Sequence, residues 1–489
     1  MLSTIEKTRL RVSHGTEAKK KSQLGQFLTP EKIAKFMAEL FPVADGSCRL
    51  LDAGAGVGSL SSAFIERSLK NKRGFDDLQL TAFELDESIH TDLVDSLDEC
   101  TNKLPFSYEI IGNDFIEEAV NRIQFGLCDF THAILNPPYK KISSNSRYRL
   151  LLRQVGIETV NLYAAFVALS VLLMRPGGQI VAIIPRSFCN GPYYRPFREF
   201  LFERTAIRHI HLFESRNQAF KDDNVLQENI IIHLECAAQQ GQVTISTSAD
   251  DSFTDLCNYD QPFNRIVFPD DPERFIHVPT SLEKNTFELS AAIRCSLEDI
   301  GLKVSTGPVV DYRLKEYLRD IPAEDTVPLL YPCHFKLGEV VWPIDGSKKP
   351  NAIQRTADTE KWLYPNGFYC VVRRFSSKEE KRRIIASVVD PNALDGAQML
   401  GFENHLNVLH ENKQGMSEVM ARGLAVFLNT TIVDEHFRRF SGHTQVNATD
   451  LKLMKYPDRD ILIELGQWAM QHKQLSQTMI DEKLGEMIA

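Results

Sequence analysis

The segment LLDAGAGVGSLSSAFIE (residues 50–66) predicts a buried strand, a glycine turn and a helix. The strand is expected to end at Asp52, and Gly54, Gly56 and Gly58 form the turn. Glycines let the backbone approach a ligand, and the helix that follows offers unpaired N–H groups at its N-terminus. A dinucleotide-binding turn has the spacing G-x-G-x-x-G, whereas this one has D-x-G-x-G-x-G. The acid before the first glycine favours a ligand with an amino acid portion; a purely structural turn is the alternative.

Short apolar runs on both sides of this segment alternate with amphipathic stretches. SLSSAFIERSLKN and NLYAAFVALSVLLM have helical spacing. Such alternation is typical of βαβ units and a mostly parallel sheet, so the predicted fold class is α/β. The expected strands are CRLLDAG (48–54), LTAFELD (80–86), THAILNPP (131–138) and GQIVAIIP (178–185), followed by HIHLFES and NIIIHLEC.

The texture of the sequence changes after about residue 240. The stretch AAQQGQVTISTSADD is dominated by small and polar residues, and strand-like pieces and turn signals follow it without regular alternation. We therefore expect a basic N-terminal arm at residues 1–24, an α/β domain at 25–240 and a separate α+β domain at 241–489.

Length and composition exclude several classes of protein. The chain has 489 residues, a net charge of −9 and 43% hydrophobic residues, which is ordinary for a globular protein. No apolar run reaches the roughly 18 residues of a membrane span, and the basic N-terminus lacks the apolar core of a signal peptide, so we expect a cytoplasmic protein. The nine cysteines include no close pair, which argues against a zinc site and a disulfide scaffold, and no metal is expected.

Acidic residues follow two further expected strands. AFELD places Glu84 where an acid can accept both hydroxyls of a ribose, with Asp86 as a weaker candidate. GNDF places Asp114 and Phe115 after the strand SYEIIGND. An aspartate accepts a hydrogen bond from an adenine amino group, and a phenylalanine packs on the ring. Solvated loop acids are the alternative, but in this order the residues indicate an adenosine site.

The tetrapeptide NPPY (136–139) follows the apolar strand HAIL, at the sheet edge where open α/β folds hold ligands. The Asn136 side-chain oxygen and the Pro137 carbonyl can both accept hydrogen bonds from one planar amino group, which makes its nitrogen nucleophilic. The consecutive prolines Pro137 and Pro138 restrict the backbone and hold these acceptors rigid. Tyr139 offers a face on which a target ring can stack. The tetrapeptide therefore indicates chemistry on an amino nitrogen.

Together the motifs resemble those of the S-adenosylmethionine-dependent, γ-class adenine-specific DNA methyltransferases of type II restriction–modification systems. The resemblance covers residues 23–240 well and the remainder loosely. In this family a G-Q-F-x-T-P element precedes the glycine turn and closes over the methionine end of the cofactor, and GQFLTP (25–30) matches it. The resemblance implies a Rossmann-like methyltransferase sheet, a C-terminal target-recognition domain at 241–489, and methyl transfer to the 6-amino group of an adenine flipped out of double-stranded DNA.

The resemblance also assigns roles to individual residues. The cofactor-binding residues that it implies are Thr29, Pro30, Asp52, Gly54, Gly56, Glu84, Asp114 and Phe115. The catalytic residues at the target base are Asn136, Pro137, Pro138 and Tyr139. In the γ class a late aromatic residue sandwiches the flipped base against the tyrosine. Phe220 is the best match for it, while Phe213 and a core role for either phenylalanine remain alternatives.

Two stretches of the C-terminal part have features of a DNA-reading surface. VVRRFSSKEEKRR (371–383) mixes cations with an aromatic residue, which suits contacts to phosphates and base edges; a solvated helix start is the alternative. FRRFSGHTQVNATDLKLMKYP (437–457) resembles the segment that closes the recognition region in related enzymes; a structural turn is the alternative. Candidate DNA-binding residues here are Arg373, Arg374, His443 and Gln445. No nuclease motif is visible, so we expect a separate restriction endonuclease as a partner.

Positive charge is concentrated locally although the chain is acidic overall. Residues 1–24, 140–153 and 371–383 carry net charges of +4, +5 and +4. The second segment begins with Lys140 and Lys141, directly after NPPY. It predicts phosphate contacts there and salt-dependent DNA binding.

Other functions are compatible with parts of this pattern. NPPY also occurs in methyltransferases that modify glutamine in protein release factors, but those chains are shorter and lack a large C-terminal domain. An RNA-base methyltransferase would use the same pocket, although the C-terminal half resembles no known RNA-binding module. A non-catalytic DNA-binding protein with a relic cofactor fold is disfavoured by the intact NPPY, Glu84 and Asp114.

Overall fold

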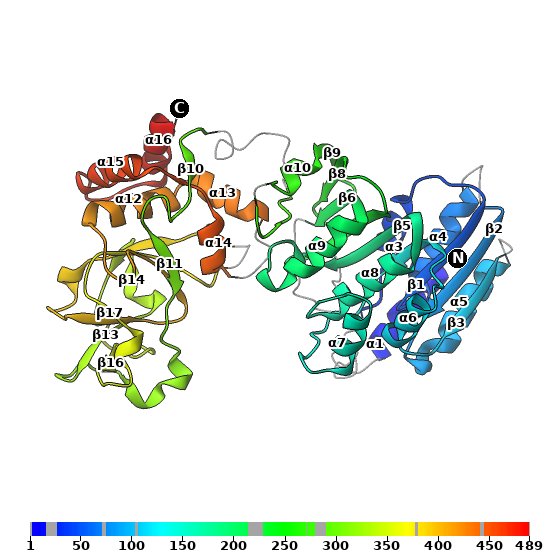
Figure 1. Cartoon of the computed structure of the whole chain (residues 1–489), viewed down its shortest axis with the longest axis horizontal. Helices are drawn as coiled ribbons and strands as arrows, with labels where there is room; N and C mark the ends of the chain where they lie inside the picture. The colour runs from blue at the N-terminus through cyan, green and yellow to red at the C-terminus, as the bar shows by residue number, and fades with distance from the viewer. Residues whose placement is uncertain are drawn as a thin grey trace. The chain divides into compact units, whose positions relative to one another are not determined.

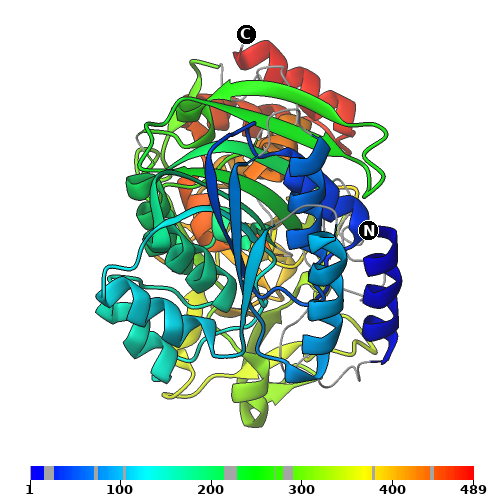
Figure 2. The same cartoon turned by 90° about the vertical axis from the view of Figure 1, so that its right-hand side faces the viewer.

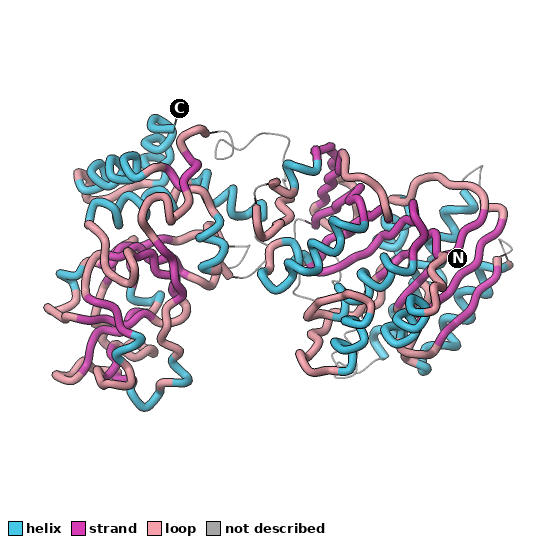
Figure 3. The backbone as a smooth tube through the Cα atoms, in the orientation of Figure 1, coloured by secondary structure: helices cyan, strands magenta, loops and turns pink. Residues whose placement is uncertain are grey.

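The computed structural model describes residues 2–15, 27–70, 75–102, 106–213, 228–269, 271–278, 290–376, 380–440 and 445–488. The chain divides into two compact parts, Met1–Leu282 and Glu283–Ala489, which we call unit 1 and unit 2. Both units combine helices with strands (Figure 3).

One mixed sheet forms the centre of unit 1 (Figure 1). Within the described residues it has nine strands, in the order β3 (Ser107–Ile111), β2 (Asp77–Phe83), β1 (Ser47–Ala53), β4 (Phe130–Leu135), β5 (Met174–Pro185), β7 (Asn229–Cys236), β6 (Thr205–Phe213), β8 (Gln242–Ser248) and β9 (Cys257–Pro262). The strands from β3 to β5 run parallel, whereas β7 runs antiparallel to both β5 and β6. The predicted α/β class and its mostly parallel sheet are confirmed.

Helices cover both faces of this sheet, the blue ones on one side and the cyan and teal ones on the other (Figure 2). The two sides are formed by α1 (Leu2–Gly15), α3 (Glu31–Glu39), α4 (Ser59–Lys70) and α5 (His90–Thr101), and by α6 (Phe115–Gln124), α7 (Arg147–Gln154), α8 (Leu162–Leu173) and α9 (Arg195–Arg204). Because successive strand residues point to opposite faces, Ala182 of β5 packs in one core and Val181 in the other. Burial on both faces explains why the central strands read as continuous apolar runs.

The predicted N-terminal arm is in part a helix, α1. Its Leu2 and Ile5 are buried, and Arg9 is 1% exposed and forms an ion pair with Glu6 at 2.7 Å. These positions are three or four residues apart, so they share one helix face. The sequence interpretation considered only the number of basic residues in this arm and not the spacing of its apolar ones. Residues 16–24 lie outside the described part of the chain.

The domain boundary expected at residue 240 falls inside unit 1. The sheet continues past it, because β8 pairs with β6 and β9 pairs with β8. Val243 and Ile245 of β8 are fully buried. The division therefore lies at 282/283, and the polar stretch that suggested the boundary contains strand β8.

Unit 2 lacks regular strand–helix alternation, as expected for an α+β arrangement. Its described residues form a sheet of β11 (Lys303–Thr306), β21 (Leu406–His410), β18 (Tyr369–Arg373), β19 (Ala386–Val389), β15 (Glu339–Val340) and β14 (Phe335–Lys336); a second of β12 (Leu318–Arg319), β16 (Ala352–Gln354), β13 (Thr326–Leu330), β20 (Met399–Phe402) and β17 (Leu363–Pro365); and a pair, β10 (Ile293–Cys295) and β22 (Tyr456–Pro457). Its longer helices are α12 (Glu418–Leu428), α13 (Thr431–Phe440), α14 (Ala448–Leu453), α15 (Arg459–Met470) and α16 (Gln477–Ile488). No helix among the described residues of either unit has the length and apolar character of a membrane span.

Helices α12 and α15 approach each other through glycine. A Cβ atom on Gly423 would lie 1.9 Å from the carbonyl oxygen of Leu462, and one on Gly466 would lie 1.9 Å from that of Val419. No side chain fits at such a distance, so glycine at both positions allows the two backbones to touch.

We expect Gly466→Ala to lower the midpoint of thermal unfolding, because the added methyl group must push α12 and α15 apart at a cost of about 1–3 kcal/mol. The matched control is Gly485→Ala in α16, where a Cβ would meet nothing within 4 Å. That control should raise the midpoint slightly, since alanine favours a helix over glycine by about 1 kcal/mol. Scanning calorimetry measures both, and equal shifts would contradict this account of the helix pair.

Candidate active site

The glycine turn after β1 has the tight geometry that the sequence predicts. Gly54, Gly56 and Gly58 have φ of +93°, +58° and +83°, a region that other residues rarely adopt. Gly54 donates its N–H to the carbonyl of Phe83 at 2.9 Å, which ties the turn to the end of β2. A Cβ on Gly56 would lie 2.7 Å from Leu28, so this glycine also makes room for the segment Phe27–Pro30.

Glu84 lies directly after β2 and holds the turn in place. One carboxylate oxygen accepts the N–H of Gly56 at 2.8 Å and the other accepts the N–H of Asp86 at 2.7 Å. Glu84 is 5% exposed, and burial raises the pKa of its carboxyl group. Because a carboxylate oxygen accepts more than one hydrogen bond, ribose hydroxyls are compatible with these contacts.

Asp52 at the end of β1 is fully buried. One of its oxygens accepts the hydroxyl of Ser61 at 2.5 Å, while Oδ1 has no hydrogen-bond partner among the described residues. Burial raises the pKa of Asp52 to about 7. A buried carboxylate oxygen without a donor is a position that a cationic or N–H group of a ligand would satisfy.

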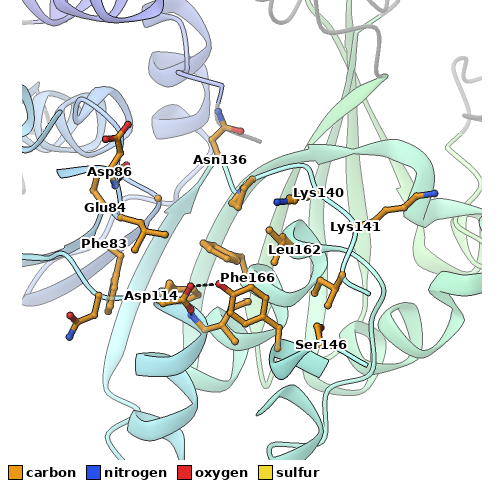
Figure 4. Close-up of a pocket in the computed structure, with 18 of the residues that line it drawn as sticks. Phe83, Glu84, Asp86, Asp114, Asn136, Lys140, Lys141, Ser146, Leu162 and Phe166 are labelled. Atoms are coloured by element: carbon orange, nitrogen blue, oxygen red, sulfur yellow. Dashed lines mark hydrogen bonds between the residues drawn. The ribbon is translucent and has the colours of Figure 1, made fainter. Parts of the chain in front are cut away.

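Asp114 directly precedes α6 and carries more contacts than the sequence suggested. Its Oδ1 caps the helix by accepting the N–H of Ile116 at 2.9 Å, and its Oδ2 accepts the hydroxyl of Tyr148 at 2.5 Å (Figure 4). Phe115, 4% exposed, packs between Phe83 and Phe166 with ring centroids at 5.0 and 4.8 Å.

The NPPY tetrapeptide continues directly from the end of β4. Asn136 Nδ2 donates to the carbonyl oxygen of Phe27 at 2.6 Å and to Thr29 Oγ1 at 2.9 Å. The Tyr139 hydroxyl lies 3.2 Å from both Asn136 Oδ1 and the carbonyl oxygen of Ile183 in β5. Burial raises the pKa of Tyr139 well above its ordinary value, so this hydroxyl stays protonated.

A cavity of about 400 Å³ joins the ends of β1, β2 and β4 (Figure 4). It brings together predicted residues from separate motifs, namely Gly54, Glu84, Asp114, Phe115, Asn136, Pro138, Lys140 and Lys141. Other predicted residues do not line it: Thr29, Pro30, Asp52, Gly56, Pro137 and Tyr139. The side chain of Lys141 points away from the cavity (Figure 4).

Sequence reasoning missed the wall that α7 and α8 contribute. Tyr148 of α7 and Leu162 and Phe166 of α8 also line the cavity. The helical spacing of NLYAAFVALSVLLM predicted a helix, but it gave no signal that separated residues facing a ligand from core residues.

The predicted sandwich residue Phe220 lies outside the described residues, as do His443 and the first two residues of GQFLTP. The alternative candidate, Phe213, is 2% exposed in β6 and packs against His211 at 4.6 Å between ring centroids. Phe213 is therefore a core aromatic residue.

The structure joins the two predicted DNA-reading stretches of unit 2. Phe375 and Gln445 form a β-bridge, and Val446 donates its N–H to the carbonyl of Arg374 at 2.7 Å. Phe375 is 44% exposed, and its ring lies 4.8 Å from that of His405, which the sequence had not singled out. Of the predicted arginines, Arg373 pairs with Glu380, and Arg374 donates to the carbonyl of Asn404 at 3.2 Å.

The basic segment 140–153 is less cationic in the folded chain than its composition indicates. Arg147 pairs with Glu117 at 2.9 Å, and Arg149 and Arg153 both pair with Glu158. These acids lie outside the segment, so counting charge within it overestimated the positive charge left for phosphates.

We expect Asp52→Asn to change the pH dependence of stability. An unfolded aspartate titrates near pH 4 and the folded one near 7, so stability from Asp52 is full at low pH and is lost as the pH rises between these values. Asparagine does not ionise, so the variant does not lose this stability. The difference in unfolding midpoint, variant minus wild type, should therefore rise from pH 5 to pH 8, by ~2–4 °C for each kcal/mol of stability that the wild type loses. The control is Asp45→Asn, which makes the same substitution at an exposed position. A difference for Asp52→Asn that does not change with pH would contradict the burial argument.

Comparisons with known proteins place the chain in a family. Residues 64–220 match the Eco57I restriction-modification methylase family. The type II methyltransferase M.BsuBI of Bacillus subtilis is 52% identical over 100% of this chain and 98% of its own length. The type II methyltransferase M.PstI of Providencia stuartii is 41% identical over 96% of this chain and 93% of its own length.

Solved structures share the fold at low identity. A cryo-electron microscopy structure of a DrdV–DNA complex matches 96% of this chain and 59% of its own with a TM-score of 0.53 at 13% identity. The Type ISP restriction-modification enzyme LlaGI, a nuclease-deletion mutant with a DNA substrate mimic, matches 91% of this chain and 54% of its own with a TM-score of 0.51 at 11% identity.

The residues of the cavity fit S-adenosylmethionine as cofactor. Its volume is in the range of small-molecule sites, and it combines the carboxylates of Glu84 and Asp114 with the aromatic rings of Phe83 and Phe115. Asp52 does not line the cavity, but it lies two residues before Gly54, which does, and among the described residues its Oδ1 has no hydrogen-bond partner. With relatives matched over nearly their whole lengths, the chain belongs to the family of type II DNA methyltransferases of restriction–modification systems, whose methyl donor is S-adenosylmethionine.

Proposed function

We propose that the chain methylates the 6-amino group of an adenine flipped out of double-stranded DNA at a specific site. The observation that carries this proposal is that one cavity is lined both by Asn136 and Pro138 of NPPY and by the acids Glu84 and Asp114. An amino group bound at NPPY would therefore lie next to the bound cofactor.

Asn136 and Pro137 would activate the target by position and charge. The Asn136 Oδ1 and the Pro137 carbonyl oxygen accept hydrogen bonds from the amino group and favour the positive charge that develops on its nitrogen. S-adenosylmethionine supplies a methyl group that is already activated, so most of the remaining work is alignment. Because Tyr139 stays protonated, we assign it a stacking and hydrogen-bonding role, not that of a base.

Base flipping follows from the position of the target amino group inside duplex DNA. An amino group inside a duplex is covered by its neighbours, and extruding the base costs a few kcal/mol that stacking recovers. We propose Tyr139 as one stacking face. Phe220 remains our prediction for the other.

We propose unit 2 as the target-recognition domain. Its candidate contacts to DNA are Arg373, Arg374, Gln445 and, outside the described residues, His443. The β-bridge between Phe375 and Gln445 supports a shared surface of these stretches. In unit 1, Lys140 and Lys141 remain candidates for phosphate contacts, and binding should weaken with salt.

The partner protein and the cellular location follow from the same proposal. A separate restriction endonuclease that cuts the unmethylated site is the expected partner of a modification methyltransferase. The cytoplasm is the proposed location, because the DNA of bacteria, the source of both close relatives, lies there.

The other substrates with the same chemistry are a glutamine side chain of a protein and an RNA base. The full-length match to type II methyltransferases favours DNA over both. Transfer of a labelled methyl group to duplex DNA, RNA and a release factor would separate the three, and analysis of the modified nucleosides would identify the base.

We expect Asn136→Ala to lower the rate of methyl transfer to duplex DNA by about 100-fold or more, because one of the two acceptors is lost. Asn121→Ala, an exposed asparagine of α6, is the matched control and should keep the wild-type rate. The product should be N6-methyladenine. An Asn136→Ala enzyme with full rate, or a product methylated on another base, would overturn the proposal.

A further inference from the structure

We propose that Thr29 is a positioning residue for the methyl acceptor site: together with the carbonyl of Phe27, its hydroxyl fixes the orientation of the Asn136 amide. The resemblance to known methyltransferases assigned Thr29 only to the cofactor. This inference rests on the proposed function, because it concerns the oxygen that would accept the target amino group.

The amide nitrogen of Asn136 is fully used by this segment. An amide N–H₂ group has two hydrogens, and the two acceptors are the Phe27 carbonyl oxygen at 2.6 Å and Thr29 Oγ1 at 2.9 Å. Both donors therefore point away from any target bound at NPPY.

Phe27 determines which way the amide faces. A carbonyl oxygen only accepts hydrogen bonds, so an amide turned by 180° would place Oδ1 against the oxygen of Phe27 and lose a donor–acceptor pair. The Thr29 hydroxyl adds the second contact, and because residue Thr29 is only 4% exposed, water competes little for it.

The orientation decides whether the site can bind an amino group. In the observed orientation Oδ1 remains on the NPPY side, where the Tyr139 hydroxyl lies at 3.2 Å. The reversed amide would present N–H to the target N–H₂, so donors would face each other and one acceptor would be lost. Because the amide is fixed before the target binds, the reaction does not have to supply the free energy of turning it.

The segment that holds Asn136 is itself held rigidly. Pro30 precedes α3, and its carbonyl accepts the N–H of Ala34 at 2.9 Å; Ala34 and Met37 of that helix are fully buried. Leu28, between the two residues that bind Asn136, lies over Gly56 of the cofactor turn. Neighbouring residues of one segment thus contact the two halves of the site.

The test compares Thr29→Val with Thr29→Ser and with Thr205→Val. Valine has the shape of threonine without the hydroxyl, and serine keeps the hydroxyl. Thr205 is the matched control, since it is 1% exposed and its hydroxyl donates to a backbone carbonyl at 2.8 Å in another part of unit 1. Three quantities are measured on the full chain: the single-turnover rate of methyl transfer at saturating duplex and cofactor, the Kd for S-adenosylmethionine without DNA, and the unfolding midpoint.

For Thr29→Val we expect a single-turnover rate about 10-fold lower, the size of one lost hydrogen bond, and a cofactor Kd within about twofold of the wild type. Thr29→Ser should recover most of the rate, and Thr205→Val should keep all of it. If Thr29→Val unfolds at a lower temperature than Thr205→Val, Thr29→Ala replaces it in the same comparison.

A raised cofactor Kd with an unchanged rate at saturation would overturn the inference and leave Thr29 as a cofactor contact. An unchanged rate and an unchanged Kd would overturn it as well. A wild-type chain that methylates no nucleic acid would instead refute the proposed function, so the two failures are distinguishable.

Discussion

The orientation of one side-chain amide, that of Asn136, is the constraint on which the rest of the site depends. Its nitrogen is bound by the segment before α3, and its oxygen lies beside Tyr139 at the end of β4. The proline pair that follows cannot supply N–H groups to compete for these acceptors. The target nitrogen is activated only if the Asn136 oxygen faces it. Two hydrogen bonds, to Phe27 and Thr29, hold the amide in that orientation.

The cofactor side of the cavity is organised on the same plan. Glu84 fixes the glycine turn by accepting a hydrogen bond from the N–H of Gly56. The carbonyl of Phe83, at the end of β2, also binds the turn by accepting the N–H of Gly54. The backbone N–H groups of the glycine turn thus bond to polar groups of the neighbouring strand and loop and not to water. Because the carboxyl ends of parallel strands meet at one sheet edge, short loops suffice to bring both halves of the reaction together.

This geometry explains why much of the site was readable from sequence. Residues directly after a buried strand, such as Glu84 and Asn136, have their position set by strand order, and the strands were visible as apolar runs. Residues whose place depends on contacts distant in sequence were missed. Tyr148 reaches Asp114 from a helix, Arg147 is paired with Glu117, and β8 extends the sheet past the expected boundary by pairing with β6. The spacing of residues along the chain cannot predict partners that only the folded chain brings together.

The most direct test of this account is a structure of the full chain bound to its duplex and to an unreactive analogue of S-adenosylmethionine. The account predicts that the amino nitrogen of a flipped adenine lies about 2.7–3.2 Å from both Asn136 Oδ1 and the Pro137 carbonyl oxygen, with Asn136 Nδ2 still on Phe27. An adenine left in the helical stack, or an amino group facing Asn136 Nδ2, would contradict it.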